Sequence, residues 1–549
     1  MGQGALRIDG ATTQLPPSYG RLAAITLRVL GGRHAFALSF LYHPPSTAGP
    51  YASLRVGTGT SGDRLLSATA PGTGWHALAD LDDAGLALLL LALAVVCVAE
   101  LGGPGCLFLF GLAGVGTLII VAQAAFLQRG AAAVVLAGVV LVLARPRHAW
   151  LIAWFAVVYL CGVHLVHSAP SIGYVDYRTA GNDWLTYESQ ARSLLTGSLQ
   201  GGENVFYYQP AWRYILFLER ALFGDGDVLR TIFSFVSVNI AAIAAALWIG
   251  RNVSAVSKRL AMVVVIGLVL EVLNSGAVRT FLEASASESP TWALIPLLIA
   301  IPFVRPRSRW PWVLGPAAAA LTIITRPNQA LAGLVFLVVF ILAAPAGRRR
   351  SLAIGLGLFV VVALLPSLHD AIYGNRFHLA ITSGTTSQTL NIPPSRLIHF
   401  FSDASVRNEL RVHAEEILDL TGPPGSWSFA LSLFMHALLL CWLAAVVFAI
   451  RARRRFARGQ VLATALPAAY LLPHLIYQVD TYFPRHIIAG YETMAFVAIG
   501  VMAALWSPSA APQESQSQPT EARGDEGSHG ADARRGVWRP ARLLGDDGG

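Results

Sequence analysis

The chain has 549 residues, of which 54% are hydrophobic and only 13% are charged, and its mean hydropathy is +0.55. This composition excludes a soluble protein with one apolar core inside a charged surface, and it indicates a chain that lies largely within a membrane. The formal charge of +9 comes mainly from arginines in short loops, so it indicates membrane topology and not nucleic-acid binding.

Residues 1–83 precede the apolar runs and have the pattern of a soluble, β-rich segment. Stretches such as RLAAITLRVL and HAFALSFLYH alternate with turns rich in Pro, Gly and Ser. We expect a small sandwich on the outer side of the membrane, serving either as a spacer or as a carbohydrate-binding module. No short leader opens the chain, so either the first span carries this segment across or the start is truncated.

Thirteen apolar runs follow, and we expect each to be a membrane-spanning helix, because a helix satisfies its own backbone across about 30 Å of hydrocarbon. Their expected positions are about 84–100, 104–127, 131–144, 149–167, 228–250, 260–275, 290–304, 311–325, 329–345, 351–367, 428–450, 460–478 and 486–506. The sequence therefore predicts an all-α polytopic membrane domain at 84–506 and a disordered cytoplasmic tail at 507–549.

The short loops between these runs alternate in charge. One set holds 16 Lys and Arg residues, whereas the opposite set holds only Arg129, Arg279, Arg326 and Arg485. The positive-inside rule places the first set in the cytoplasm. The segment 1–83 and the two long loops 168–227 and 368–427 then face outward.

The first long outward loop carries the most informative residues. Asp183 directly precedes a helical run from about Trp184 to Leu195, and the aromatic stretch FYYQPAWRY follows, which predicts a platform on the membrane surface. Asp183 can cap this helix, act as a catalytic base, or do both. Asp176, seven residues upstream, is the second candidate base.

Several residues of this loop follow one another in a distinctive order: Asp183, Tyr187, the Ala-Arg pair at 191–192, Tyr207 and Tyr208 with Pro210, and LFG at 222–224. This order resembles the first outward loop of the GT-C superfamily of membrane glycosyltransferases, in particular the branch of the protein O-mannosyltransferases and the lipid A aminoarabinose transferase. The resemblance implies a GT-C-like fold and transfer of a sugar from a polyprenyl-phosphate donor to a glycan, lipid or protein acceptor. It also implies an outward-facing site in a bacterial inner membrane.

The implied reaction is an inverting single displacement, which needs a base for the acceptor hydroxyl and cations for the departing phosphate. Asp183 is then the candidate base. Tyr187, Glu188, Tyr207 and Tyr208 are candidate substrate contacts, although tyrosines at this depth also form ordinary interfacial belts.

Outside this loop, charged residues at outward span ends are further candidates. Glu283 and Glu288 could bind acceptor hydroxyls or a divalent cation, or could simply be solvated. Arg326 and Arg485 oppose the positive-inside bias, and each could bind phosphate in a fork geometry or reach lipid headgroups, with His486 lining the same region. No metal-ligand spacing is recognisable, so metal dependence stays open.

Two other functions remain open on the sequence. An O-antigen-type polymerase would also have many spans and large outward loops, but it would rely on arginines in those loops. A lipid-linked sugar flippase would need charged residues buried in mid-span and interrupted helices, and Glu271 is the main charge that we recognise within a span. The loop 368–427, rich in polar residues, Gly and Pro, fits a lid that binds the acceptor.

Overall fold

The computed structural model describes residues 3–15, 36–41, 84–103, 127–168, 191, 210–223, 227–275, 278, 281–282, 287–326, 329–374, 377, 394–418, 427–475 and 483–507. The chain is mostly helical in these ranges. Five helices are long and apolar enough to cross a membrane: Ala84–Gly103, Ile232–Gly250, Ala346–Leu368, Leu431–Arg451 and Ile487–Trp506. They indicate an integral membrane protein, as the composition predicts.

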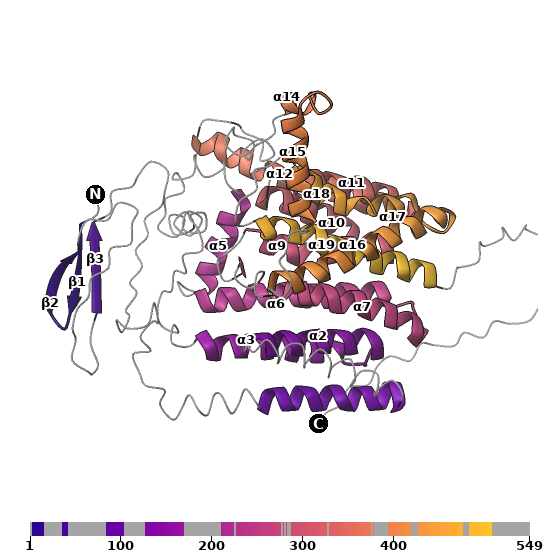
Figure 1. The fold of residues 1–549 in the computed structure, drawn as a ribbon, viewed down its shortest axis with the longest axis horizontal. Helices are drawn as coiled ribbons and strands as arrows, with labels where there is room; N and C mark the ends of the chain where they lie inside the picture. Colours follow the sequence, from indigo (N-terminus) through magenta and orange to yellow (C-terminus); the bar gives the residue numbers. More distant parts are fainter. Residues whose placement is uncertain are drawn as a thin grey trace, which may run out of the picture. The chain divides into compact units, whose positions relative to one another are not determined.

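The N-terminal residues form a three-stranded antiparallel sheet with the order β2-β1-β3 (Figure 1). Its strands are β1 (Gln3–Ile8), β2 (Ala11–Leu15) and β3 (Phe36–Leu41). Asp9 and Gly10 join β1 to β2, both with positive φ, as a tight hairpin turn requires. The stretch HAFALSFLYH contains β3, but β1 and β2 precede every stretch that we identified as β-rich. Residues 42–83 lie outside the described ranges, so the predicted sandwich is not tested.

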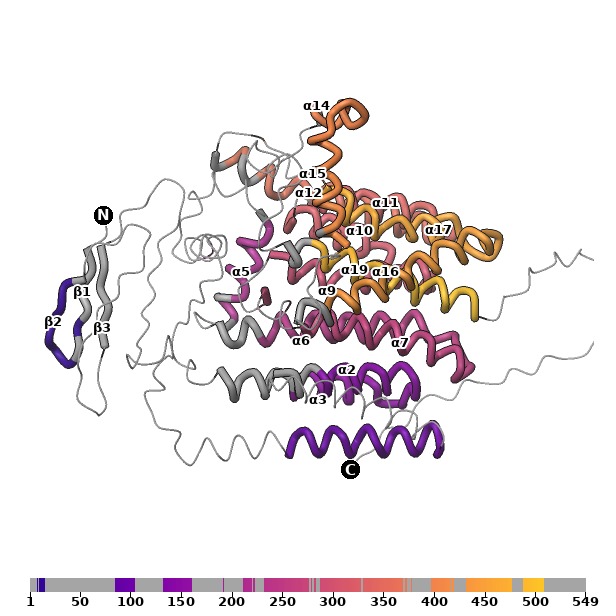
Figure 2. Tube along the Cα trace, in the orientation of Figure 1, coloured from indigo at the N-terminus to yellow at the C-terminus, as the bar shows by residue number. Residues whose placement is uncertain are grey.

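Most of the helical region consists of helices that run side by side, as Figures 1 and 2 show. After Ala84–Gly103, the bounds are α2 (Leu127–Ala144), α3 (Ala149–Ser168), α5 (Pro210–Phe223), α6 (Asp227–Gly250), α7 (Val256–Leu273), α9 (Ser289–Val304), α10 (Trp310–Thr325), α11 (Ala330–Ala343), η3 (Ala346–Arg348), α12 (Arg349–Gly374), α14 (Pro394–Leu397), α15 (Ala404–Ile417), α16 (Trp427–Arg451), η4 (Arg453–Arg455), α17 (Arg458–Ala463), α18 (Leu466–Leu471), η5 (Leu472–Leu475) and α19 (Phe483–Trp506). Each predicted run overlaps described helix except the run at 104–127, which lies almost wholly outside the described residues, and the run at 460–478 is divided. The total of thirteen spans stays a prediction.

The run at 460–478 is not one continuous helix as the sequence predicts, but is divided into α17, α18 and η5. Pro467 and Pro473 lack the N–H group that a continuous helix would need at those positions. At the break, the indole Nε1 of Trp442 in α16 donates to the carbonyl oxygen of Thr464 at 2.8 Å. The side chain of Gln460 donates to the carbonyl oxygen of Pro302 in α9 at 3.1 Å. Trp442 thus satisfies a carbonyl at the break, and Gln460 satisfies a carbonyl near the end of α9.

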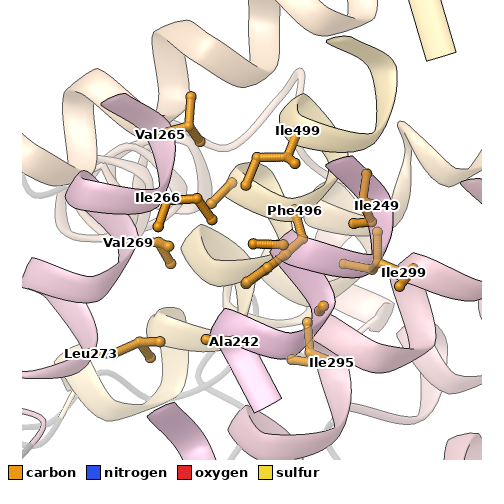
Figure 3. Close-up of a cluster of buried hydrophobic side chains, with 14 of the residues drawn as sticks. Ala242, Ile249, Val265, Ile266, Val269, Leu273, Ile295, Ile299, Phe496 and Ile499 are labelled. Carbon is orange, nitrogen blue, oxygen red and sulfur yellow. The ribbon is translucent and has the colours of Figure 1, made fainter. Parts of the chain in front are cut away.

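The core lies around α19, which is buried along nearly all of its apolar length. Phe496 and Ile499 of α19 lie among Ile295 of α9, Ala242 of α6 and Ile266 of α7, and Figure 3 shows this cluster. Burial of large aliphatic and aromatic side chains from four helices excludes both water and lipid from this centre, and close packing here fixes how the helices lie against one another.

The basic loops make contacts with one another. Arg145, which follows α2, donates to the carbonyl oxygen of Arg251 at 2.8 Å, and Arg259 donates to the carbonyl oxygen of Leu143 at 2.5 Å. Burial lowers the pKa of the Arg145 guanidinium, and the nearby positive charge of Arg259 lowers it further. These contacts join alternate loops of the chain, as expected for helices that cross in alternating directions. The cytoplasmic location of these loops stays a prediction.

Candidate functional site

Two of the charged residues selected from the sequence form a buried ion pair. Nη2 of Arg326 lies 2.5 Å from Oε1 of Glu288, and their side chains are only 6% and 0% exposed. The Ser287 hydroxyl donates to the other carboxylate oxygen of Glu288 at 3.4 Å. The pair is therefore almost completely removed from solvent.

The helix ends explain why these two residues are in these positions. Glu288 is the cap residue at the start of α9, where the helix dipole favours a negative charge. Arg326 is the cap residue at the end of α10, where the dipole favours a positive charge. Pro327 follows Arg326 in the sequence, and a residue before proline is disfavoured in the helical conformation. The backbone of Arg326 is accordingly non-helical, with φ −142° and ψ 88°.

Polar atoms without a hydrogen-bond partner lie within one helical turn of this pair along the chain. Thr291 Oγ1 and Trp292 Nε1 follow Glu288 in α9, and Gln329 Oε1 follows Arg326. All three side chains are fully buried, and none of these atoms has a partner within the described part of the chain. Buried polar groups are nearly always hydrogen-bonded in native proteins, so these atoms are candidate contacts for a bound ligand or water.

Part of the first long loop packs beside the same helix end. Ala211 at the start of α5 packs against Ile324, two residues before Arg326. On another part of α5, Trp212 and Leu216 form a buried cluster with Ala191. Ala191 belongs to the Ala-Arg pair of the loop, and α5 begins at the proline of its aromatic stretch. The structure thus brings two parts of this loop together at α5, next to the end of α10.

Most of the other candidates cannot be located. The following lie outside the described residues: Asp176, Asp183, Tyr187, Glu188, Tyr207, Tyr208 and Glu283. Arg485 and His486 lie in the first turn of α19, and their side chains are outside the description. The roles predicted for these residues therefore stay predictions.

The sequence reasoning missed two further buried polar residues, Glu492 in α19 and Tyr470 in α18. Both side chains are fully buried, and neither the carboxylate oxygens nor the tyrosine hydroxyl has a hydrogen-bond partner in the described residues. Glu271, which we identified instead, is only partly buried. Glu492 is the single acidic residue within the last apolar run, and that position could have identified it. The apolar residues around it keep the mean hydropathy of the run high, so it does not stand out.

A metal site is not evident among the described residues, since no three His, Cys, Asp or Glu side chains gather there. The candidate acids Asp176, Asp183, Glu188 and Glu283 lie outside those ranges, so metal dependence is not tested.

Comparison of the chain with protein-family models, with curated proteins and with solved structures gives no match.

Proposed function

We propose that the protein is a membrane glycosyltransferase that moves a sugar from a polyprenyl-phosphate donor to an acceptor hydroxyl at the outer membrane surface. The observation that supports this most is the buried pair of Glu288 and Arg326 beside α5. A buried ion pair is often no more stabilising than apolar residues of similar volume. Its presence at the end of two apolar helices therefore favours a site for a charged ligand over a purely structural role.

Arg326 is the residue that would bind the donor phosphate. A guanidinium group has five N–H donors in a planar fork that matches two phosphate oxygens. Glu288 would keep the guanidinium in place through its contact with Nη2. Arg485, with His486 beside it, is proposed to act on the same phosphate from the start of α19.

The proposed reaction is a single displacement. The acceptor oxygen forms a bond to the anomeric carbon of the sugar while the bond from that carbon to the phosphate oxygen breaks. The electron pair of the broken bond leaves with the polyprenyl phosphate, whose charge Arg326 stabilises. The acceptor proton passes to the carboxylate of Asp183, and the configuration of the sugar is inverted.

The proposal includes the finer topology: thirteen spans, with the loops 168–227 and 368–427 facing outward from a bacterial inner membrane. Cysteines placed at Gly201 and Gly384 should react with an impermeant reagent in intact cells. A cysteine at Gly347, in the basic turn η3, should not react, although the structure leaves open space for its side chain. Labelling at Gly347 would overturn this orientation.

The direct test is transfer by the purified protein in liposomes, with a set of radiolabelled prenyl-phosphate sugars and envelope extracts as acceptors. Arg326→Lys keeps the charge but loses the fork, so it should weaken donor binding and not only turnover. The matched control is Arg350→Lys, which changes an exposed arginine at the start of α12. This variant should bind donor normally. The proposal fails if no prenyl-phosphate sugar binds or is consumed.

A second candidate function, a lipid-linked sugar flippase, is favoured by two specific features. The helix broken at α17 and α18 and the fully buried Glu492 are both typical of transporters. A fluorescent lipid-linked sugar in the same liposomes separates the two functions, because a flippase exposes it to an external quencher without changing it chemically. Loss of this movement in Glu492→Gln, with no transfer reaction in the wild type, would replace the transferase proposal.

A further inference from the structure

The turn between α14 and α15 exposes large apolar side chains outside the long apolar helices. Phe401 is 91% exposed and Ile398 is 77% exposed, and both lie between the end of α14 and the start of α15. Such side chains are rare on a surface that meets only water, and gathered together they mark an interaction site.

The turn is held in shape by its own polar contacts. Nη1 of Arg407 donates to the carbonyl oxygens of Phe400 and Phe401 at 3.1 and 2.8 Å. The two phenylalanine rings meet edge to face, with centroids 5.1 Å apart. The guanidinium of Arg396 lies 3.3 Å from each carboxylate oxygen of Glu409. The turn that carries these apolar side chains therefore has a defined conformation.

The other end of α15 is attached at the boundary of the apolar layer. The hydroxyl of Tyr491 donates to the carbonyl oxygen of Ile417 at 2.8 Å, and Nδ1 of His413 lies 2.6 Å from the carbonyl oxygen of Leu475. Tyr491 is four residues beyond Ile487, the first apolar residue after Arg485 and His486 in α19, which is about 6 Å along the helix. Helical side chains lean toward the N-terminus, so its hydroxyl reaches back toward that boundary.

Figure 2 shows α15 running across the direction of α16 and α19. A helix attached at the boundary and directed across the bundle extends along the membrane surface, and its apolar turn then meets lipid. We propose that the α14–α15 turn is an interfacial anchor, in which Ile398 and Phe401 enter the boundary between headgroups and acyl chains. Arg407 and Arg411, one turn apart on the exposed face of α15, then lie at the level of the lipid phosphates.

This anchor goes beyond the proposed function and does not depend on it, because it requires only the membrane and the fold. Three features of α15 match a lipid surface. It is attached near the boundary of the apolar layer, it runs across the direction of the bundle, and its arginines lie near exposed aromatic rings. The anchor also holds the helical part of the loop 368–427 at both ends, at the apolar turn and at the contacts with Tyr491 and Leu475.

The test is a spin label at position 401, introduced as Phe401→Cys into protein reconstituted in liposomes. The four native cysteines are first replaced by alanine: Cys97, Cys106, Cys161 and Cys441. Relaxation by oxygen, which concentrates in lipid, is compared with relaxation by a water-soluble nickel complex. The control is the same label at Asn408→Cys, on the exposed face of α15.

The label at 401 should respond mainly to oxygen, and the label at 408 mainly to nickel. Equal response to nickel at both positions would overturn the anchor, because the turn would then lie in water. Protection of position 401 from both reagents would also overturn it, because a protein surface would then cover the turn. A label at Ile398→Cys gives an independent reading in case the change at 401 disturbs the fold, and catalytic activity enters none of these outcomes.

Discussion

Arg326 at the end of α10 and Glu288 at the start of α9 neutralise each other, with 2.5 Å between Nη2 and Oε1. Arg326 was selected because an arginine at an outward span end opposes the usual charge bias, and Glu288 because a carboxylate beside a membrane needs solvent or a partner. The contact explains both anomalies at once. It also links the two residues, so that changing either alone leaves a buried charge in the other.

Arg326→Ala should therefore destabilise the protein by about 3–5 kcal/mol, the usual cost of removing one partner of a buried pair. The double variant Glu288→Leu with Arg326→Met should recover most of that loss, since apolar residues of similar size replace the pair. Denaturant titration in mixed micelles measures both free energies of unfolding.

Measurement of donor binding by the same variants distinguishes a structural role of the ion pair from a role in binding the donor. The stable double variant should bind no prenyl-phosphate sugar, because it has no guanidinium for the phosphate. If it binds the donor as well as the wild type does, then the pair has only a structural role.

Asp183→Asn should lower turnover by a factor on the order of a hundred or more, because asparagine cannot accept the proton of the acceptor hydroxyl. Expression and folding should survive, since asparagine caps a helix as well as aspartate does. Initial rates in membranes measure the effect, with Asp176→Asn as the comparison that should lose less. Near-normal transfer by Asp183→Asn would make Asp183 a helix cap, and Asp176, Glu283 and Glu288 would be tested next.

Gly355→Ala should separate α12 from α10. A Cβ atom at this position would lie 2.5 Å from the carbonyl oxygen of Trp312 and 2.9 Å from that of Val313, and backbone atoms cannot move aside alone. We expect a loss of about 1–3 kcal/mol in unfolding free energy, typical of overpacking. Gly357, two residues along α12, has open space around it, so Gly357→Ala should be neutral or stabilising. Equal melting temperatures for the two variants would show that the helices do not approach closely here.

Asp403 should make the start of α15 sensitive to acid. The hydroxyl of Ser405 and then its backbone N–H donate to the Asp403 carboxylate, at 2.7 and 2.8 Å, and lower its pKa. A lowered pKa in the folded state means stability that is present above the unfolded pKa of about 3.9 and is lost as the pH falls through the folded value. Amide exchange in the first turn of α15, corrected for intrinsic rates, should therefore increase below about pH 4. Asp403→Asn caps without titrating, so a wild type that behaves like this variant would contradict the prediction.

The sequence predicted the membrane class and the places of most apolar helices that the structure describes, because long apolar runs leave few alternatives to a helix in lipid. It did not predict the break after Ala463, since the run stays apolar throughout and only Pro467 and Pro473 interrupt it. Glu288 and Arg326 were found one by one, but their pairing depends on how α9 and α10 pack, which no local pattern encodes. Glu492 was missed because one acid barely changes the mean hydropathy of its run. The roles of Asp183 and its neighbours rest on residue order alone.

The broken helix at α17 and α18 also constrains the order in which the chain assembles. The carbonyl oxygen of Thr464 accepts a hydrogen bond from α16, and the side chain of Gln460 donates one to α9. The segment therefore carries unsatisfied polar groups until both helices are in the membrane. Both helices precede it in the chain and leave the ribosome first. Synthesis from the N-terminus therefore delivers the partners before the segment that needs them, and a circular permutant that begins at Arg458 should enter the membrane poorly even though its folded contacts are unchanged.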